Sequence, residues 1–186
     1  MEEICLVYDK VINGRFVDLR SITIDDAEFS FMIRADKKNR DLVGQPAASL
    51  DEQLEFIKWQ MNEPNDYYFV VLNKKGERIG LTGVYDIKDD MGEVGREVSY
   101  GTPAETMETS LLLNGFCKNI LHLKKICYVI YLNNKKQMHI QKRNGIEPLK
   151  IIKRSGIESA YYESEIGIND DYIQSLLDII GDDQVE

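Results

Sequence analysis

The order of extended and helical patterns in the middle of the chain is the feature that most constrains its fold. A continuous apolar run spans residues 67–72, and two runs with the alternation of half-buried strands span residues 79–87 and 93–100. A helical pattern over residues 105–121 and an apolar run over residues 126–132 follow. Such a crossover makes the two strands that flank the helix parallel neighbours, unless another strand lies between them. We therefore expect a mixed α/β (α+β) fold whose sheet is mostly antiparallel and becomes parallel around one crossover.

The flanking segments supply further strands and helices. Residues 4–8 and 15–22 are predicted to be strands on either side of the hairpin-turn dipeptide Asn13-Gly14. No repeat or linker divides the chain, so we expect a single domain over residues 1–186. The remaining predicted elements are helices from Thr23 and from Ser49, a short helix over 135–143, a closing hairpin of 148–154 and 160–168, and a terminal helix over about 171–180.

Composition argues against several functional classes. The net charge of −9 disfavours a nucleic-acid partner, because such proteins carry a basic surface. No segment approaches the roughly 20 apolar residues that span a membrane. The acidic start of the sequence lacks the basic region of a signal peptide, so a cytoplasmic location is expected. The three cysteines lack CxxC spacing and only two histidines accompany them, so we expect neither a disulfide framework nor a metal site.

Four short segments, in this order, carry a family resemblance. Residues 14–28 are similar to a strand-to-helix entry, residues 79–83 (Ile-Gly-Leu-Thr-Gly) to a third strand, and residues 93–96 to the start of a fourth. Residues 134–146 resemble an asparagine, a short helix and a closing Gly-Phe in which isoleucine replaces the phenylalanine. Together they resemble the GNAT N-acetyltransferase family, and within it the branch of ribosomal-protein and amino-sugar acetyltransferases. The resemblance implies the GNAT fold, with a β-α-β core that binds acetyl-CoA.

The resemblance covers about residues 14–155 and implies an enzyme that moves an acetyl group from acetyl-CoA to a primary amine. An amino-sugar nucleotide used in surface polysaccharide synthesis is the leading expectation for the acceptor. A protein N-terminus or another small amine is the alternative acceptor. A catalytically silent GNAT-like binding module is the alternative from another functional class. A small-molecule amine is the expected partner, and a homodimer is a possible assembly.

The family resemblance places a diphosphate-binding loop at residues 101–106, where relatives usually carry Q/R-x-x-G-x-G/A. This sequence departs from that pattern, because Gly101 replaces the basic or amide residue and Ala104 and Thr106 hold the two small positions. Diphosphate capture needs free main-chain N–H groups at a helix N-terminus. We expect the loop to offer them, provided that Glu105 does not turn inward. The residues expected to contact acetyl-CoA are Val98, Tyr100, Ala104, Glu105, Thr106, Met107, Asn133 and Asn134.

Acetyl transfer to an amine needs a base for the ammonium proton, a donor for the carbonyl oxygen and, ideally, an acid for the leaving thiolate. The resemblance makes Glu93, at the start of the fourth strand, the candidate base. Glu97 is its substitute, expected on the same face of that strand. A main-chain N–H near Val98 is the candidate oxyanion donor.

The candidate acid and the substrate contacts are less determined by the sequence. Gln141 stands where many relatives carry a tyrosine acid, so Tyr131 or another tyrosine replaces it, or the thiolate leaves unassisted. Asn134, or Asn133 if the register slips by one, matches a family asparagine that contacts the cofactor or orders the site. The residues expected to contact the acceptor are Trp59, Tyr85 and Asn39, with core packing as the alternative for the aromatic ones.

Overall fold

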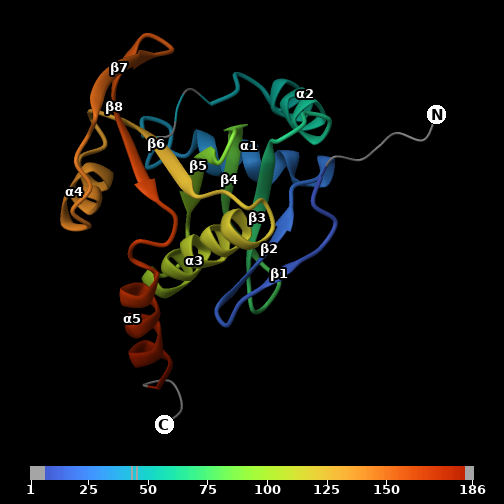
Figure 1. Ribbon diagram of the computed structural model, residues 1–186. Coiled ribbons are helices and arrows are strands. Elements are labelled where there is room, and N and C mark those ends of the chain that lie inside the picture. Colours follow the sequence, from blue (N-terminus) through green and yellow to red (C-terminus); the bar gives the residue numbers. More distant parts are fainter. Residues whose placement is uncertain (1–6, 43, 45, 183–186) are drawn as a thin grey trace.

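The structure is a computed structural model that describes residues 7–42, 44 and 46–182. These residues form one eight-stranded sheet in the order β1-β2-β3-β4-β5-β6-β8-β7, flanked by helices (Figure 1). The strands are β1 (Ile12–Asn13), β2 (Val17–Ser21), β3 (Tyr67–Asn73), β4 (Arg78–Lys88), β5 (Met91–Ser99), β6 (Lys125–Tyr131), β7 (Lys150–Arg154) and β8 (Ile157–Glu165). The helices are the 3-10 turn η1 (Ile24–Asp26), α1 (Ala27–Ala35), α2 (Leu50–Met61), α3 (Pro103–Asn119), α4 (Lys135–Arg143) and α5 (Asp170–Asp182).

The predicted crossover is confirmed. Strand β5, helix α3 and strand β6 follow one another, and β5 and β6 are parallel neighbours. The other neighbouring strands in the described part of the sheet are antiparallel. The fold class predicted from the order of the patterns is therefore correct, and α3 begins at Pro103, two residues earlier than expected.

The start of the sheet differs from the prediction. Residues 4–6 of the first expected strand lie outside the described residues, and Val7 and Tyr8 are not in a strand. The first strand is instead the short β1, whose Asn13 pairs with Asp18 of β2. The predicted hairpin is present, but its turn lies at residues 14–16, because Asn13 belongs to β1.

A buried carboxylate from α3 holds this hairpin in place. The two oxygens of Glu108 accept the main-chain N–H groups of Arg15 (2.8 Å), Phe16 (2.6 Å) and Val17 (2.7 Å). Hydrogen bonds to a charged acceptor are stronger than neutral ones. Glu108 therefore fixes the first hairpin to the central helix, a role that is structural.

Helices cover both faces of the sheet, and each face has its own apolar core (Figure 1). Helix α3 supplies Leu113, Phe116 and Cys117 to one core, while α1 and α2 supply Ile33 and Ile57 to the other. Ile120, the C-cap residue of α3, is half-exposed and lies outside this core. The strands alternate between the two cores, as a sheet covered on both faces requires.

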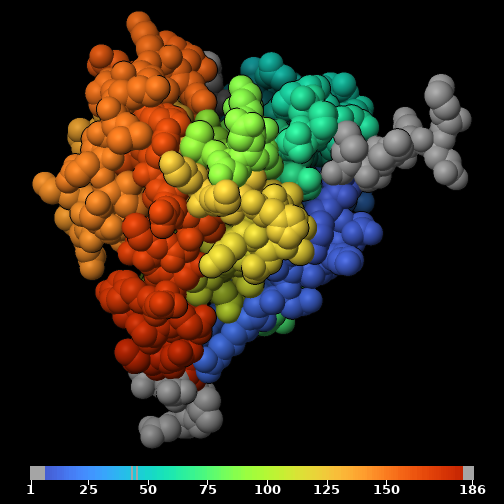
Figure 2. Space-filling model, viewed as in Figure 1, coloured from blue at the N-terminus to red at the C-terminus, as the bar shows by residue number. Residues whose placement is uncertain are grey.

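The C-terminal third forms one flank of the molecule, coloured orange to red in Figure 2. Strand β8 pairs with β6 over seven residues, from Lys125↔Glu165 to Tyr131↔Ser159, and β7 forms the outer edge. The predicted short helix over residues 135–143 is confirmed, and so is the closing hairpin. Helix α5 packs against α3, where Asn114 Nδ2 donates to Asp170 Oδ1 (2.8 Å). No helix in the described part of the chain is long and apolar enough to cross a membrane.

Candidate active site

The parallel strands β5 and β6 are joined over a short distance only. Three residue pairs connect them, from Met91↔Lys125 to Glu93↔Cys127. Beyond Glu93, β5 continues along β4 as far as Ser99, and β6 continues along β8 as far as Tyr131. The main-chain groups that the two strands would otherwise share therefore face a gap within the sheet.

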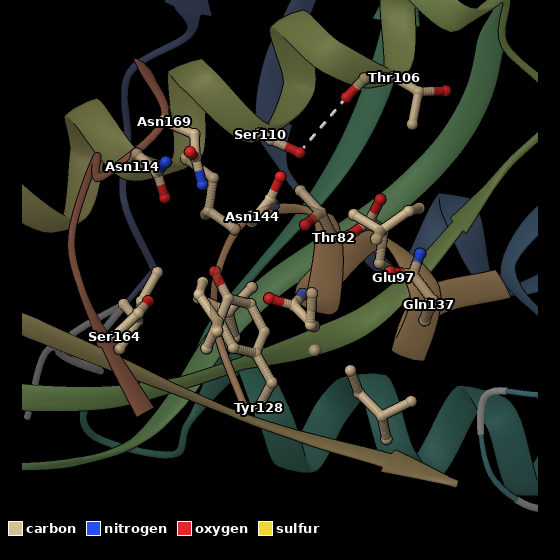
Figure 3. Close-up of a pocket in the computed structure, with 18 of the residues that line it drawn as sticks. Thr82, Glu97, Thr106, Ser110, Asn114, Tyr128, Gln137, Asn144, Ser164 and Asn169 are labelled. Atoms are coloured by element: carbon tan, nitrogen blue, oxygen red, sulfur yellow. Dashed lines mark hydrogen bonds between the residues drawn. The ribbon is translucent and has the colours of Figure 1, made fainter. Parts of the chain in front are cut away.

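A cavity of about 620 Å³ occupies this gap and the space between α3 and α4 (Figure 3). In Figure 3, Thr106, Ser110 and Asn114 follow one another along α3, and Tyr128 of β6 lies across the cavity from them. Other side chains that line the cavity include Glu93, Glu97, Tyr131, Asn134, Gln137 and Gln141.

An irregularity in β5 determines which side chains face the cavity. Gly95 pairs with Gly83 and Val98 pairs with Leu81, so Arg96 and Glu97 together oppose one residue of β4. Arg96 has a left-handed backbone conformation (φ 56°). A bulge of this kind inserts one extra residue and bends the strand.

The bulge reverses the side-chain alternation of β5. Val94 packs against the core under α3, whereas Val98 belongs to the core under α1 and α2. Without a bulge, two residues four positions apart would share a face. The expectation that Glu93 and Glu97 lie on the same face was therefore wrong, and the two carboxylates have different surroundings.

Glu93 is buried and firmly paired. Arg154 of β7 donates to both of its carboxylate oxygens, with 2.8 Å from Nη2 to Oε2, and the Tyr85 hydroxyl donates to Oε1 at 2.9 Å. The same surroundings raise the pKa of Tyr85, first through burial and then through the charge of Glu93. Hydrogen-bond donors therefore occupy both oxygens of this carboxylate.

Glu97 lies in the cavity without such partners. It makes no hydrogen bond or ion pair with any residue that the structure describes. Burial raises the pKa of its carboxyl group, and the charge of Lys136 opposes this only in part. Tyr128 lies nearby, and its pKa is raised by burial and by the charge of Glu97. An unpaired carboxylate with a raised pKa in a cavity is typical of a general base.

The other predicted catalytic residues, Tyr131 and Asn134, lie at and just after the C-terminal end of β6. Tyr131 lines the cavity, and its hydroxyl lies beside Gly44, where an added Cβ would be 3.3 Å away. Asn134 also lines the cavity, is buried, and caps α4 by accepting the N–H of Gln137 (3.2 Å). Asn133 points elsewhere, because its Nδ2 donates to the carbonyl of Asp41 (2.8 Å).

The N-terminus of α3 is not open as expected. Glu105 turns back, and its Oε2 accepts the N–H of Thr102 at 2.7 Å, while Thr102 Oγ1 accepts the N–H of Glu105 at 3.3 Å. This reciprocal arrangement is a capping box. The prediction that this turn presents unblocked main-chain amides is therefore wrong for the conformation in the structure.

The remaining predicted contacts of acetyl-CoA are dispersed. Thr106 and Met107 line the cavity, and Ala104 is buried in the first turn of α3. The side chain of Val98 lies in the core under α1 and α2, and Tyr100 is half-exposed with its hydroxyl donating to Asp36 at 3.1 Å. The cavity therefore brings Thr106 and Met107 together with Asn134 and leaves Val98 and Tyr100 outside its wall.

The three predicted acceptor contacts are not gathered at one place. Tyr85 lines the main cavity. Trp59 is half-exposed and lines a second hollow that Tyr85 lines as well, whereas the Asn39 amide donates to the carbonyl of Ile33 (2.8 Å). Of the three, Tyr85 alone lies beside Glu93.

Sequence reasoning missed two features of the site. Arg154 comes from the far edge of the sheet, and no local pattern connects it with Glu93. Thr106, Ser110 and Asn114 recur at every fourth position of α3, which was a signal in the sequence for a polar face towards a cavity.

No described group of three or more His, Cys, Asp or Glu side chains is arranged to hold a metal ion. The described thiols are not among the groups that line the cavity. Cys117 and Cys127 are both buried and free.

The fold, the opened sheet and the cavity define an acyltransferase of the GNAT type, and comparison with known proteins agrees. The family model "Acetyltransferase (GNAT) domain" matches residues 17–147, which is more than half of the chain. The chain therefore belongs to the GNAT acetyltransferase family and carries an acetyl-transfer domain. No curated protein matches the sequence.

Several solved structures share the fold at low sequence identity. A GCN5-related N-acetyltransferase from Brucella melitensis is similar, with 15% identity, a TM-score of 0.74, and coverage of 91% of this chain and 86% of that one. The apo form of FdhC, described as a nucleotide-linked sugar GNAT, has 19% identity and a TM-score of 0.72. The match covers 91% of this chain and 98% of that one. A point mutant of the spermidine N-acetyltransferase SpeG from Vibrio cholerae has 18% identity and a TM-score of 0.63. The match covers 83% of this chain and 96% of that one.

Proposed function

We propose that this protein transfers an acetyl group from acetyl-CoA to the primary amine of an amino-sugar nucleotide, in the cytoplasm. The observation that carries the proposal is the cavity at the opening between β5 and β6, where a thioester and an amine can meet between two strands. Its walls include side chains from α1 and β7 as well as from α3 and α4. Donor and acceptor can therefore approach the gap from different elements of the fold.

We assign the base to Glu97 and a positioning role to Glu93. The neutral amine is the nucleophile, so a carboxylate must take the ammonium proton before or during attack. Glu97 is unpaired and has a raised pKa, whereas both oxygens of Glu93 are occupied by Arg154 and Tyr85. Glu93 and Arg154 then hold the β7 edge of the site against β5.

Main-chain groups of β5 serve the developing charge on the acetyl oxygen. The N–H of Tyr100 donates to the carbonyl of Ile79 on β4, so by alternation the N–H of Val98 also faces β4. The N–H of Ser99, which lies between them in the regular part of β5, then faces the gap. This N–H, next to Val98, is the proposed oxyanion donor.

The bond changes balance with two proton transfers. The amine nitrogen attacks the acetyl carbon, the carbon–sulfur bond breaks, and the sulfur leaves with the bonding electron pair. Glu97 accepts the proton of the amine. Tyr131, the C-terminal residue of β6, is the proposed donor of a proton to the sulfur. Gln141 lines the same cavity but carries no acidic proton at neutral pH.

The charges on the acceptor side support an acceptor with an anionic group. Arg34 of α1 and Arg154 of β7 both line the cavity, and Arg154, which is paired with Glu93, lies close to Tyr85. Guanidinium groups recognise phosphate well, and an aromatic ring suits a sugar or base. These groups support a sugar nucleotide as the acceptor.

Thiol release from acetyl-CoA tests the reaction and its acceptor together. Amino-sugar nucleotides, N-terminal peptides and spermidine are each supplied to the intact protein. We expect turnover with the amino-sugar nucleotides, a rate loss of about 10²–10⁴-fold in Glu97→Gln, and a smaller loss in Glu93→Gln. Greater turnover with peptides or spermidine would contradict the proposed acceptor. A more severe loss in Glu93→Gln would contradict the assigned base.

The silent binding module is the second candidate, and the capped N-terminus of α3 favours it. Thermal unfolding with acetyl-CoA separates the two, because ligand at 100 times its dissociation constant stabilises a protein by about 2.7 kcal/mol. An unchanged melting temperature at millimolar acetyl-CoA would support the silent module.

A further inference from the structure

The main-chain donors at the N-terminus of α3 are nearly all in use. Gly101 N–H donates to Ser99 Oγ at 2.9 Å, and Thr106 N–H donates to the carbonyl of Thr102 at 3.0 Å. The capping box engages the N–H groups of Thr102 and Glu105, and Pro103 has none. Among the residues that the structure describes, Ala104 has the one N–H of this loop without an acceptor.

The occupant of the loop is itself an anion. The carboxylate of Glu105 lies where the partial positive charge of a helix N-terminus attracts negative groups. A diphosphate would seek the same N–H groups for the same reason. The loop contains no Lys or Arg that would offset the charge of Glu105. The two anions therefore exclude each other, by occupancy and by repulsion.

The contact is weak enough to be displaced. Glu105 is only partly buried, and its hydrogen bonds hold no element other than its own helix turn. Loss of a capping side chain typically changes a helix equilibrium by about fivefold. The groove itself, formed by α3, α4 and β6, is closed neither by this side chain nor by the cap.

We propose that Glu105 is an internal competitor of the donor's diphosphate. This inference rests on the proposed use of acetyl-CoA. Binding of the donor must release the Thr102 N–H from Glu105, so the diphosphate adds less affinity here than an open loop would give. Recognition of the donor then depends mainly on the pantetheine arm in the groove between α3 and α4.

Calorimetric titration with CoA and with pantetheine, which lacks the diphosphate, tests the proposal. Glu105→Gln retains the cap and removes the charge, and Glu105→Ala removes both. We expect each variant to bind CoA about tenfold more tightly than the parent protein, with unchanged affinity for pantetheine. Glu52→Gln is the matched control, because Glu52 accepts the N–H of Ala48 at the start of α2, away from the cavity.

The outcomes separate this inference from the proposed function. Equal or weaker CoA binding by both Glu105 variants, while the parent binds CoA, overturns the competitor role and leaves the enzyme assignment intact. The same gain for pantetheine as for CoA also overturns it, since pantetheine has no diphosphate. If no variant binds CoA or pantetheine, the proposed function fails and this inference fails with it. Circular dichroism of each variant confirms that the fold is retained.

Discussion

Arg96 and Asp66 form a two-armed ion pair at the bulge of β5, with distances of 2.5 Å from Nη1 to Oδ1 and 2.6 Å from Nη2 to Oδ2. The guanidinium group lies 4.1 Å from the centre of the Tyr85 ring, and Gln60 Nε2 donates to the main-chain oxygen of Asp66 (2.9 Å). This arrangement fixes a residue with a left-handed backbone. It therefore fixes the direction of Glu97, the next residue of β5.

Asp66→Asn should weaken both the fold and the site. Removal of one charge from a buried pair leaves the other uncompensated, which destabilises a protein by about 3–5 kcal/mol. Urea unfolding measures the change, and we expect activity at temperatures where the variant is folded to fall as well. Asp41→Asn, in the exposed pair with Arg40, should change stability by less than about 1 kcal/mol. Similar effects of the two substitutions would contradict the role given to the Arg96–Asp66 pair.

Glu97→Gln should raise stability at neutral pH. Burial raises the pKa of Glu97 in the folded state, so the folded protein binds this proton more tightly than the unfolded chain does. The contribution of Glu97 to stability is then greatest below the unfolded pKa of about 4.3 and is lost as pH rises through the folded pKa. Melting temperatures from pH 4 to pH 8 should show that the gain of the variant grows with pH. A constant difference across this range would contradict the raised pKa.

Glu108→Gln should destabilise the protein by weakening the attachment of the first hairpin to α3. The substituted amide would supply one neutral acceptor and an NH₂ group where three main-chain N–H groups now meet a carboxylate. We expect a loss of about 1–3 kcal/mol in the free energy of unfolding, measured with urea. Glu55→Gln, on the exposed face of α2, is the control and should change it by about 0.5 kcal/mol or less. A loss no larger than that of the control would show that Glu108 does not hold the hairpin.

Two of the thiols should be inert in the native protein. Burial raises the pKa of Cys117 to about 12 and also raises the pKa of Cys127. Thiolates, not thiols, react with alkylating reagents. At pH 8 we expect modification of both cysteines only after unfolding, read by mass spectrometry of peptides. Fast labelling of Cys117 in the folded protein would show that its helix opens locally.

The sequence was sufficient for the architecture because each element carries a local signal. The alternation in residues 79–87 and 93–100, the hairpin signal of Asn13-Gly14 and the spacing of Ser49 from Glu52 depend on neighbours in the chain. Ser49 does cap α2, by accepting the N–H of Glu52 at 3.2 Å. Such signals fix the elements and their order, and the crossover rule then fixes the direction of β6.

The site depends on relationships that no local signal contains. The bulge at Arg96 is a single extra residue, and it reversed the expected facing of Glu97. The pairing of Glu93 with Arg154 spans 61 positions of the sequence. The inward turn of Glu105 follows from capping chemistry, and Thr102 stands at the required three-residue spacing. That feature was therefore open to prediction from the sequence.

The three residue pairs that join β5 to β6 divide the sheet into unequal panels, one of five strands and one of three. Main-chain hydrogen bonding across the junction is sparse, and the ion pair of Glu93 with Arg154 ties the two panels through side chains. Cooperative units of a protein separate at boundaries that few main-chain hydrogen bonds cross. Amide hydrogens of β6, β8 and β7 should therefore exchange with solvent as one block, distinct from the block of β2 to β5. The gap between β5 and β6 is then also the place where the sheet separates during hydrogen exchange.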